Sequence, residues 1–134
     1  MSQSKYTDLV RAARKARSFA QARYSQFKVG AALLTAGDQI ISGCNIESSS
    51  YGLTICAERV ALTKALSEGI TDFKAIAIAA ADGFFCTPCG ACRQFLHDYA
   101  PHIDVVLTDG NNEKIIPLAE LLPLAFDDSQ LGVK

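Results

Sequence analysis

Apolar and polar residues recur along the chain in patterns that predict alternating helices and strands. Between residues 4 and 22, apolar side chains follow helical spacing, with lysines and arginines on the opposite side, which predicts a first helix. Strands are expected at 27–35 and 39–42, joined by a turn at 36–38. The polar segment 44–54, which contains several serines, is expected to be a loop.

The rest of the chain is predicted to alternate helices and strands. Its predicted elements are a helix at 56–67, a buried strand at 74–80, a helix at 89–99, strands at 104–108 and 113–116, and a short helix or turn at 118–122. The order αββαβαββα predicts an α/β fold in which helices sandwich a mixed five-stranded sheet. A length of 134 residues fits one domain, spanning 1–134. The tail beyond Phe126 is expected to be weakly ordered.

The net charge and the hydropathy of the chain indicate which kinds of partner and which cellular location to expect. The formal net charge is −1, whereas proteins that bind nucleic acid usually present a basic face. The N-terminal residues are polar and charged, without the apolar core of a secretory signal. No apolar run approaches the roughly 20 residues of a membrane span. We therefore expect a cytoplasmic protein that binds neither nucleic acid nor membrane.

The cysteines cluster in a way that predicts a metal site. The chain has five of them, at positions 44, 56, 86, 89 and 92. Disulfides are rare in the cytosol, and an odd number with three members close in sequence favours metal binding over bridges. Two segments stand out, Cys56-Ala57-Glu58-Arg59 and the run from Pro88 to Gln94.

Zinc prefers thiolate and imidazole ligands in tetrahedral geometry. Cys89 and Cys92 are three positions apart at a helix start, so both sulfurs can face one ion. Cys56 begins the other helix and can supply a third sulfur. His97 lies about 140° around the helix from Cys92, so neither it nor His102 is an obvious fourth ligand. An unfilled position is typical of a catalytic zinc site, where water binds.

Glu58 and Arg59 suit the surroundings of such a site. Glu58 follows Cys56 by two residues, so its carboxylate can lie over the open position and move protons. Three thiolates carry excess negative charge, which helix N-termini stabilise. Arg59 can donate hydrogen bonds to the ligand sulfurs. The alternative is a structural zinc closed by Cys44 or Cys86 as a fourth ligand.

The two segments match the signature of zinc deaminases in its three-cysteine form. At these residues the chain resembles the small, homotetrameric cytidine deaminases. Further motifs of that family match across nearly the whole chain, in order: Tyr24 to Ala32, Gly43 to Glu47, and Glu120 to Pro123 followed by Phe126. The chain departs from the family at Arg23, Val60 and Thr87, where proline, threonine and serine are frequent, and none of these departures removes a catalytic group.

The resemblance implies a hydrolase that acts on C–N bonds of cyclic amidines. It would hold one zinc ion per subunit on Cys56, Cys89 and Cys92, and would convert cytidine and 2′-deoxycytidine to the uridine forms with release of ammonia, in pyrimidine salvage. Glu58 would protonate ring nitrogen N3 and later carry a proton to the departing amine.

The resemblance also implies substrate contacts and an assembly. Asn45 and Glu47 would bind the 3′-hydroxyl of the sugar, the Ala57 backbone amide would contact the base carbonyl, and Phe27 would pack against the base. Tyr51 and Phe126 would complete a pocket shared between the subunits of a homotetramer.

Each substrate-binding residue also has a purely structural interpretation. Phe27 could belong to the core, Asn45 to a turn, Glu47 to a solvated loop, Tyr51 to the surface and Phe126 to tail packing. Three other functions stay open: a deaminase of a nucleoside antibiotic such as blasticidin, a polynucleotide deaminase, and a zinc-stapled binding module without catalysis. The Asn45 and Glu47 pair favours ordinary ribose, the balanced charge disfavours a polynucleotide, and a structural site has no need of Glu58.

Overall fold

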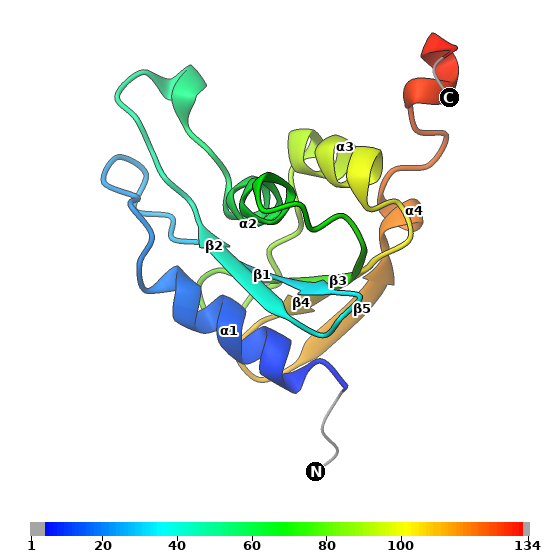
Figure 1. The fold of residues 1–134 in the computed structure, drawn as a ribbon. Coiled ribbons are helices and arrows are strands. Elements are labelled where there is room, and N and C mark those ends of the chain that lie inside the picture. Colours follow the sequence, from blue (N-terminus) through cyan, green and yellow to red (C-terminus); the bar gives the residue numbers. More distant parts are fainter. Residues whose placement is uncertain (1–4, 133–134) are drawn as a thin grey trace.

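The computed structural model describes residues 5–132, and Figure 1 shows how their elements are arranged. The elements are α1 (Thr7–Arg17), β1 (Gly30–Thr35), β2 (Ile40–Cys44), the 3₁₀ turn η1 (Tyr51–Leu53), α2 (Ala57–Ser67), β3 (Phe73–Ala79), α3 (Gly90–Tyr99), β4 (Asp104–Thr108), β5 (Glu113–Pro117), α4 (Leu118–Leu121) and the 3₁₀ turn η2 (Asp128–Leu131). The predicted order αββαβαββα is confirmed.

The strands form one five-stranded sheet in the order β2-β1-β3-β4-β5. β3 and β4 pair parallel, and the other neighbours pair antiparallel, so the predicted mixed sheet is confirmed. α1 covers one face, and α2 and α3 cover the other (Figure 1). Among residues 5–132, no helix is both long and apolar enough to cross a bilayer.

The sequence of β3 reflects burial on both faces of the sheet. Ile76 and Ile78 belong to the hydrophobic cluster that includes residues of α2 and α3. Ala75, Ala77 and Ala79 alternate with them and belong to the cluster under α1. Successive side chains of a strand point to opposite faces. The small alanines therefore let α1 lie close to the sheet, whereas the isoleucines fill the layer beneath two helices.

The first helix is shorter than the pattern predicts. α1 ends at Arg17, and the side chain of Phe19 is 62% exposed instead of buried. The backbone N–H of Gln21 donates to the carbonyl of Asn45, and Glu47 donates back to Gln21, so this segment pairs with a distant loop. The predicted start at residue 4 lies outside the described residues. The tail after Phe126 contains η2, an ordered turn that the sequence did not indicate.

Candidate active site

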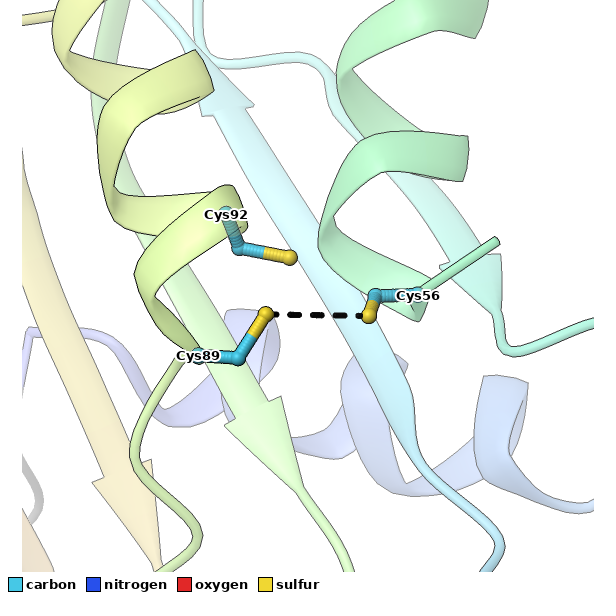
Figure 2. A group of neighbouring side chains, drawn as sticks. All are labelled: Cys56, Cys89 and Cys92. Carbon is cyan, nitrogen blue, oxygen red and sulfur yellow. Dashed lines mark hydrogen bonds between the residues drawn. The ribbon is translucent and has the colours of Figure 1, made fainter. Parts of the chain in front are cut away.

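Two helix N-termini bring the three predicted cysteine ligands together. Cys56 precedes α2 and Cys89 precedes α3 as N-cap residues, and Cys92 lies in the first turn of α3. Figure 2 shows their sulfurs turned toward one another. All three lie within 4.8 Å of one another, and the sulfurs of Cys56 and Cys89 are 3.9 Å apart. Sulfurs about 2.3 Å from a shared tetrahedral ion would lie about 3.8 Å apart, so the spacing fits zinc.

Electrostatics also favour a cation at this cluster. The hydrogen bond from Cys92 lowers the pKa of Cys56 to about 5, with help from Arg59 and Cys89. The same bond and then burial raise the pKa of Cys92 far above its ordinary value, and repulsion from the charges of Glu58 and Cys56 adds to the shift. A divalent ion would remove this repulsion and let all three sulfurs ionise.

A closed structural site lacks its fourth ligand. Within the described part of the chain, neither Cys44 nor Cys86 joins the group of ligand atoms around Cys56. The Nε2 of His97 instead lies 3.1 Å from Asp127. The donor set therefore fits the open zinc site of a catalyst better than a closed one.

Glu58 lies in the first turn of α2 and is only 5% exposed. Burial raises its pKa to about 7, with a smaller contribution from the charge at Cys56. A hydrogen bond with the Cys92 thiol opposes this shift, which places the carboxyl against the cysteine cluster. A buried carboxyl beside metal ligands can accept and return protons where bulk water is excluded.

Arg59 faces the ligand sulfurs. Its Nη2 donates to the Cys56 sulfur at 3.7 Å and to the Thr54 carbonyl at 3.4 Å. Contacts with Cys56 and Cys92 raise the pKa of Arg59 further, the Cys56 bond being the largest cause. Its Nε is buried and has no partner among the described residues. Arg59 therefore places positive charge and a hydrogen-bond donor next to the cysteine sulfurs.

Gly43 sets how closely α2 approaches the sheet. A Cβ at this position in β2 would lie 2.6 Å from the Ala61 nitrogen and 2.8 Å from the Ala57 oxygen. The first turn of α2 therefore rests directly on the β2 backbone. Ala57 is fully buried there, and this contact fixes where Cys56 and Glu58 can lie.

Hydrogen bonds join three of the predicted substrate-binding residues into one unit. Asn45 accepts from the Val29 N–H at 2.9 Å and donates to the Phe27 carbonyl at 2.8 Å. The carboxylate of Glu47 accepts from the backbone N–H of Tyr24 and Ser25, at 3.0 Å each, and from the Ser25 hydroxyl. The Ser25 bonds lower the pKa of Glu47, so it stays ionised.

The aromatic residues predicted to meet the substrate lie at the surface of the described chain. Phe27 is 44% exposed and does not belong to the core. Tyr51 is 77% exposed on η1, and together with Glu47 it lines a hollow of about 360 Å³. Phe126 is 56% exposed, and Figure 1 shows its segment extending away from the sheet. Among residues 5–132, the ring contact found for Phe27 is with Phe84 and not with Phe126.

Two contacts that the sequence did not indicate attach the C-terminal segment to α3. His97 contacts Asp127, and Gln94 donates from Nε2 to the Phe126 carbonyl at 2.7 Å. Gln94 and His97 lie two and five positions beyond Cys92, and helical spacing alone gives no sign of partners 30 or 32 residues away.

A sequence profile described as the "Cytidine and deoxycytidylate deaminase zinc-binding region" matches residues 3–108. The chain belongs to the cytidine deaminase family. Relatives in this family include a cytidine deaminase of Halalkalibacterium halodurans, 48% identical over 121 residues that span 88% of this chain and 91% of the relative. A cytidine deaminase of Sporosarcina psychrophila is 44% identical over 92% of this chain and 93% of its own.

A solved cytidine deaminase structure shares the fold. The crystal structure from Burkholderia pseudomallei superposes with a TM-score of 0.87 and 43% identity, covering 92% of this chain and all of the other. Membership in the cytidine deaminase family makes the chain a zinc-binding hydrolytic deaminase, and the three-cysteine cluster could hold the ion.

Proposed function

We propose that this protein hydrolyses cytidine and 2′-deoxycytidine to uridine and 2′-deoxyuridine, with release of ammonia, as a step of pyrimidine salvage. The observation that carries this proposal is the arrangement of three cysteine sulfurs at two helix N-termini beside the buried Glu58. Membership in the cytidine deaminase family supports it independently.

Cys56, Cys89 and Cys92 would hold one zinc ion, which when bound supplies Lewis-acid activation of water near neutral pH. Glu58 delivers a proton to ring nitrogen N3, which makes the adjacent C4 electrophilic, and later carries a proton to the leaving amine. Its burial excludes competing proton exchange with bulk water. Arg59 offsets the negative charge of the sulfurs.

Groups just before β1, just after β2 and at the start of α2 bind the nucleoside. Phe27 packs against the flat base, and the Ala57 N–H at the start of α2 contacts its carbonyl. Asn45 and Glu47 bind the sugar hydroxyl. The hydrogen bonds that hold Asn45 and Glu47 to residues 24–29 support this role, because they keep the sugar side and the base side in one rigid unit.

Four copies of the chain would assemble, with Tyr51 and Phe126 completing pockets shared between subunits. The exposure of both rings supports this, because large aromatic side chains left at a surface often mark an interface. The mass in solution tests the assembly: we expect that of a homotetramer, and an active monomer would contradict the shared pocket.

We further propose that residues 1–134 form one deaminase domain that works in the cytoplasm, where its five free cysteines stay reduced.

The test of Glu58 is replacement by Gln in purified, zinc-loaded protein. We expect zinc content to be retained and turnover of cytidine, followed by ultraviolet absorbance, to fall by about 10²- to 10⁴-fold, since Gln cannot carry the proton. Glu68→Gln, at the exposed C-terminal end of α2, is the matched control and should stay active.

Equal activity of Glu58→Gln and the unmodified protein would reject Glu58 as the proton carrier. Failure of the unmodified protein to act on cytidine or deoxycytidine, while it acts on another nucleoside such as blasticidin, would reject the proposed substrate.

A further inference from the structure

Phe27, the proposed base-packing residue, has an aromatic neighbour from a different loop. The rings of Phe27 and Phe84 are stacked, with centroids 6.1 Å apart and planes 28° from parallel. Both rings are exposed to a similar extent, 44% and 42%. Phe84 therefore lies beside Phe27 in a stacked arrangement, while Phe27 stays partly accessible to a ligand.

The loop that carries Phe84 connects β3 to the second zinc segment. Residues 80–88 leave the end of β3 and lead directly to Cys89, the N-cap of α3. This loop therefore connects the neighbourhood of Phe27, where the base is proposed to pack, with Cys89, a proposed zinc ligand.

The loop is anchored before Phe84. Asp82 lies 3.6 Å from Arg14 and 3.5 Å from Arg17, both on α1. The N–H of Gly83 donates to the Asp109 carbonyl at 2.8 Å, and Gly83 has a φ of +99°, which glycine adopts readily.

The loop is also anchored after Phe84. Phe85 packs against the main core cluster, with the Lys114 amine 5.0 Å from its ring centre, and Cys86 packs against the same cluster. Phe84 differs from these neighbours because the ring contact found for it is with Phe27. The anchors therefore hold the loop so that Phe84 presents its ring to the base-packing residue.

We propose that Phe84 is a positioning residue of the base subsite, which stacks on Phe27 and holds that ring in the orientation that packs against the pyrimidine. The inference rests on the proposed function of Phe27. An unsupported phenylalanine side chain at a surface samples several rotamers, and ordering it on binding costs free energy. A stacked neighbour lowers this cost before the substrate arrives.

The test compares Phe84→Leu with Phe84→Tyr. Leu keeps apolar bulk but lacks the flat ring, and Tyr keeps the ring. We expect Phe84→Leu to raise KM for cytidine and Ki for the product uridine by about 2- to 10-fold, as for loss of an aromatic pair. We expect kcat to change less than about twofold, since the interaction is the same in the ground and transition states. Phe84→Tyr should restore both constants.

A double variant shows whether Phe84 acts through Phe27. Phe27→Leu alone should raise KM, and adding Phe84→Leu should raise it little further, because the partner ring is already gone. Phe19→Leu, an exposed ring at the end of α1, is the matched control and should leave KM unchanged. Zinc content and thermal unfolding confirm that each variant is folded, and Phe84→Met, which also lacks the ring, replaces Phe84→Leu if that variant does not fold.

An unchanged KM in Phe84→Leu, or multiplicative effects in the double variant, would overturn the positioning role while leaving the deaminase activity intact. Absence of cytidine turnover in the unmodified protein is the distinct result that rejects the proposed function itself.

Discussion

The Asn45 side chain, which we propose binds the sugar, also stabilises the fold. Its amide oxygen and one amide hydrogen bond to the backbone at Val29 and Phe27. Removing this side chain would leave the buried Val29 N–H without its partner, at a cost of about 1–3 kcal/mol. Lower activity of an Asn45 variant would therefore combine lost sugar binding with a displaced Phe27. Measuring the free energy of unfolding of the same variant separates the two effects.

At the residue scale, a substitution of Arg59 gives a clearer prediction than one of Asn45, because its expected effect is on zinc affinity alone. Arg59→Ala removes the donor to the Cys56 sulfur and the positive charge beside the three cysteines. We expect the fold to persist and zinc affinity to fall by about 10- to 100-fold, as for other residues that support metal ligands. Competition with a chelator measures the affinity. Arg11→Ala, an exposed arginine of α1, is the control, and wild-type zinc retention and turnover in Arg59→Ala would remove this role.

At the scale of elements, the site depends on how two helices begin. α2 and α3 both start at a cysteine with extended backbone, so each helix dipole points its positive end at the sulfurs. Their N-termini meet because α2 rests on β2 and α3 follows β3 in the same layer. The metal centre is therefore sensitive to any shift of a helix against the sheet.

Gly43→Ala tests this dependence. The added methyl group would meet backbone atoms of α2 at 2.6–2.8 Å, which cannot move independently of the helix. We expect the free energy of unfolding to fall by about 1–3 kcal/mol, as in other overpacked sites. We also expect weaker zinc binding. Denaturant titration and metal analysis measure the two effects.

Gly37→Ala in the turn between β1 and β2 is the matched control, because its nearest neighbour would be 3.9 Å away. If Gly43→Ala bound zinc and unfolded like the unmodified protein, the close approach of α2 would not control the site.

At the scale of the whole molecule, the two faces of the sheet are stabilised separately. The face under α1 includes a polar link, in which the Tyr6 hydroxyl donates to Asp104 of β4 at 2.7 Å. Burial, then this hydrogen bond, raises the pKa of Tyr6 to about 12. The zinc segments lie on the opposite face, so this link contributes to stability without touching the site.

Tyr6→Phe should therefore lower the free energy of unfolding at pH 8 by about 1.5–3 kcal/mol, the range for a hydrogen bond to a charged group. Because the folded pKa lies above the unfolded value of about 10, the contribution of Tyr6 is fully present below pH 10. It is lost as the pH rises from 10 through about 12. Denaturant titrations at pH 8 and 11 should show a smaller difference between the two proteins at the higher pH.

Tyr99→Phe, whose ring is half exposed on α3, is the control at pH 8. A constant difference between Tyr6→Phe and the unmodified protein at both pH values would contradict this account.

The sequence by itself determined the order of elements, the mixed sheet and the chemistry of the metal segments. Periodicity is a local property, so it located β3, α2 and α3 to within about two residues. The spacing of Cys89 and Cys92 is also local, because both sulfurs belong to one helical turn. The same local pattern predicted a first helix that is too long at its C-terminal end, because Gln21 pairs with a loop more than 20 residues away.

Only the tertiary structure decided which residues from distant parts of the chain contact one another. Cys56 meets Cys89 across 33 positions, Asn45 reaches back to Val29, and Phe84 stacks on Phe27 from a different loop. Burial of Glu58 likewise depends on the layer formed by the sheet and both helices. Contacts of this kind arise when separate elements pack together, and no spacing along a single segment specifies which faces will meet.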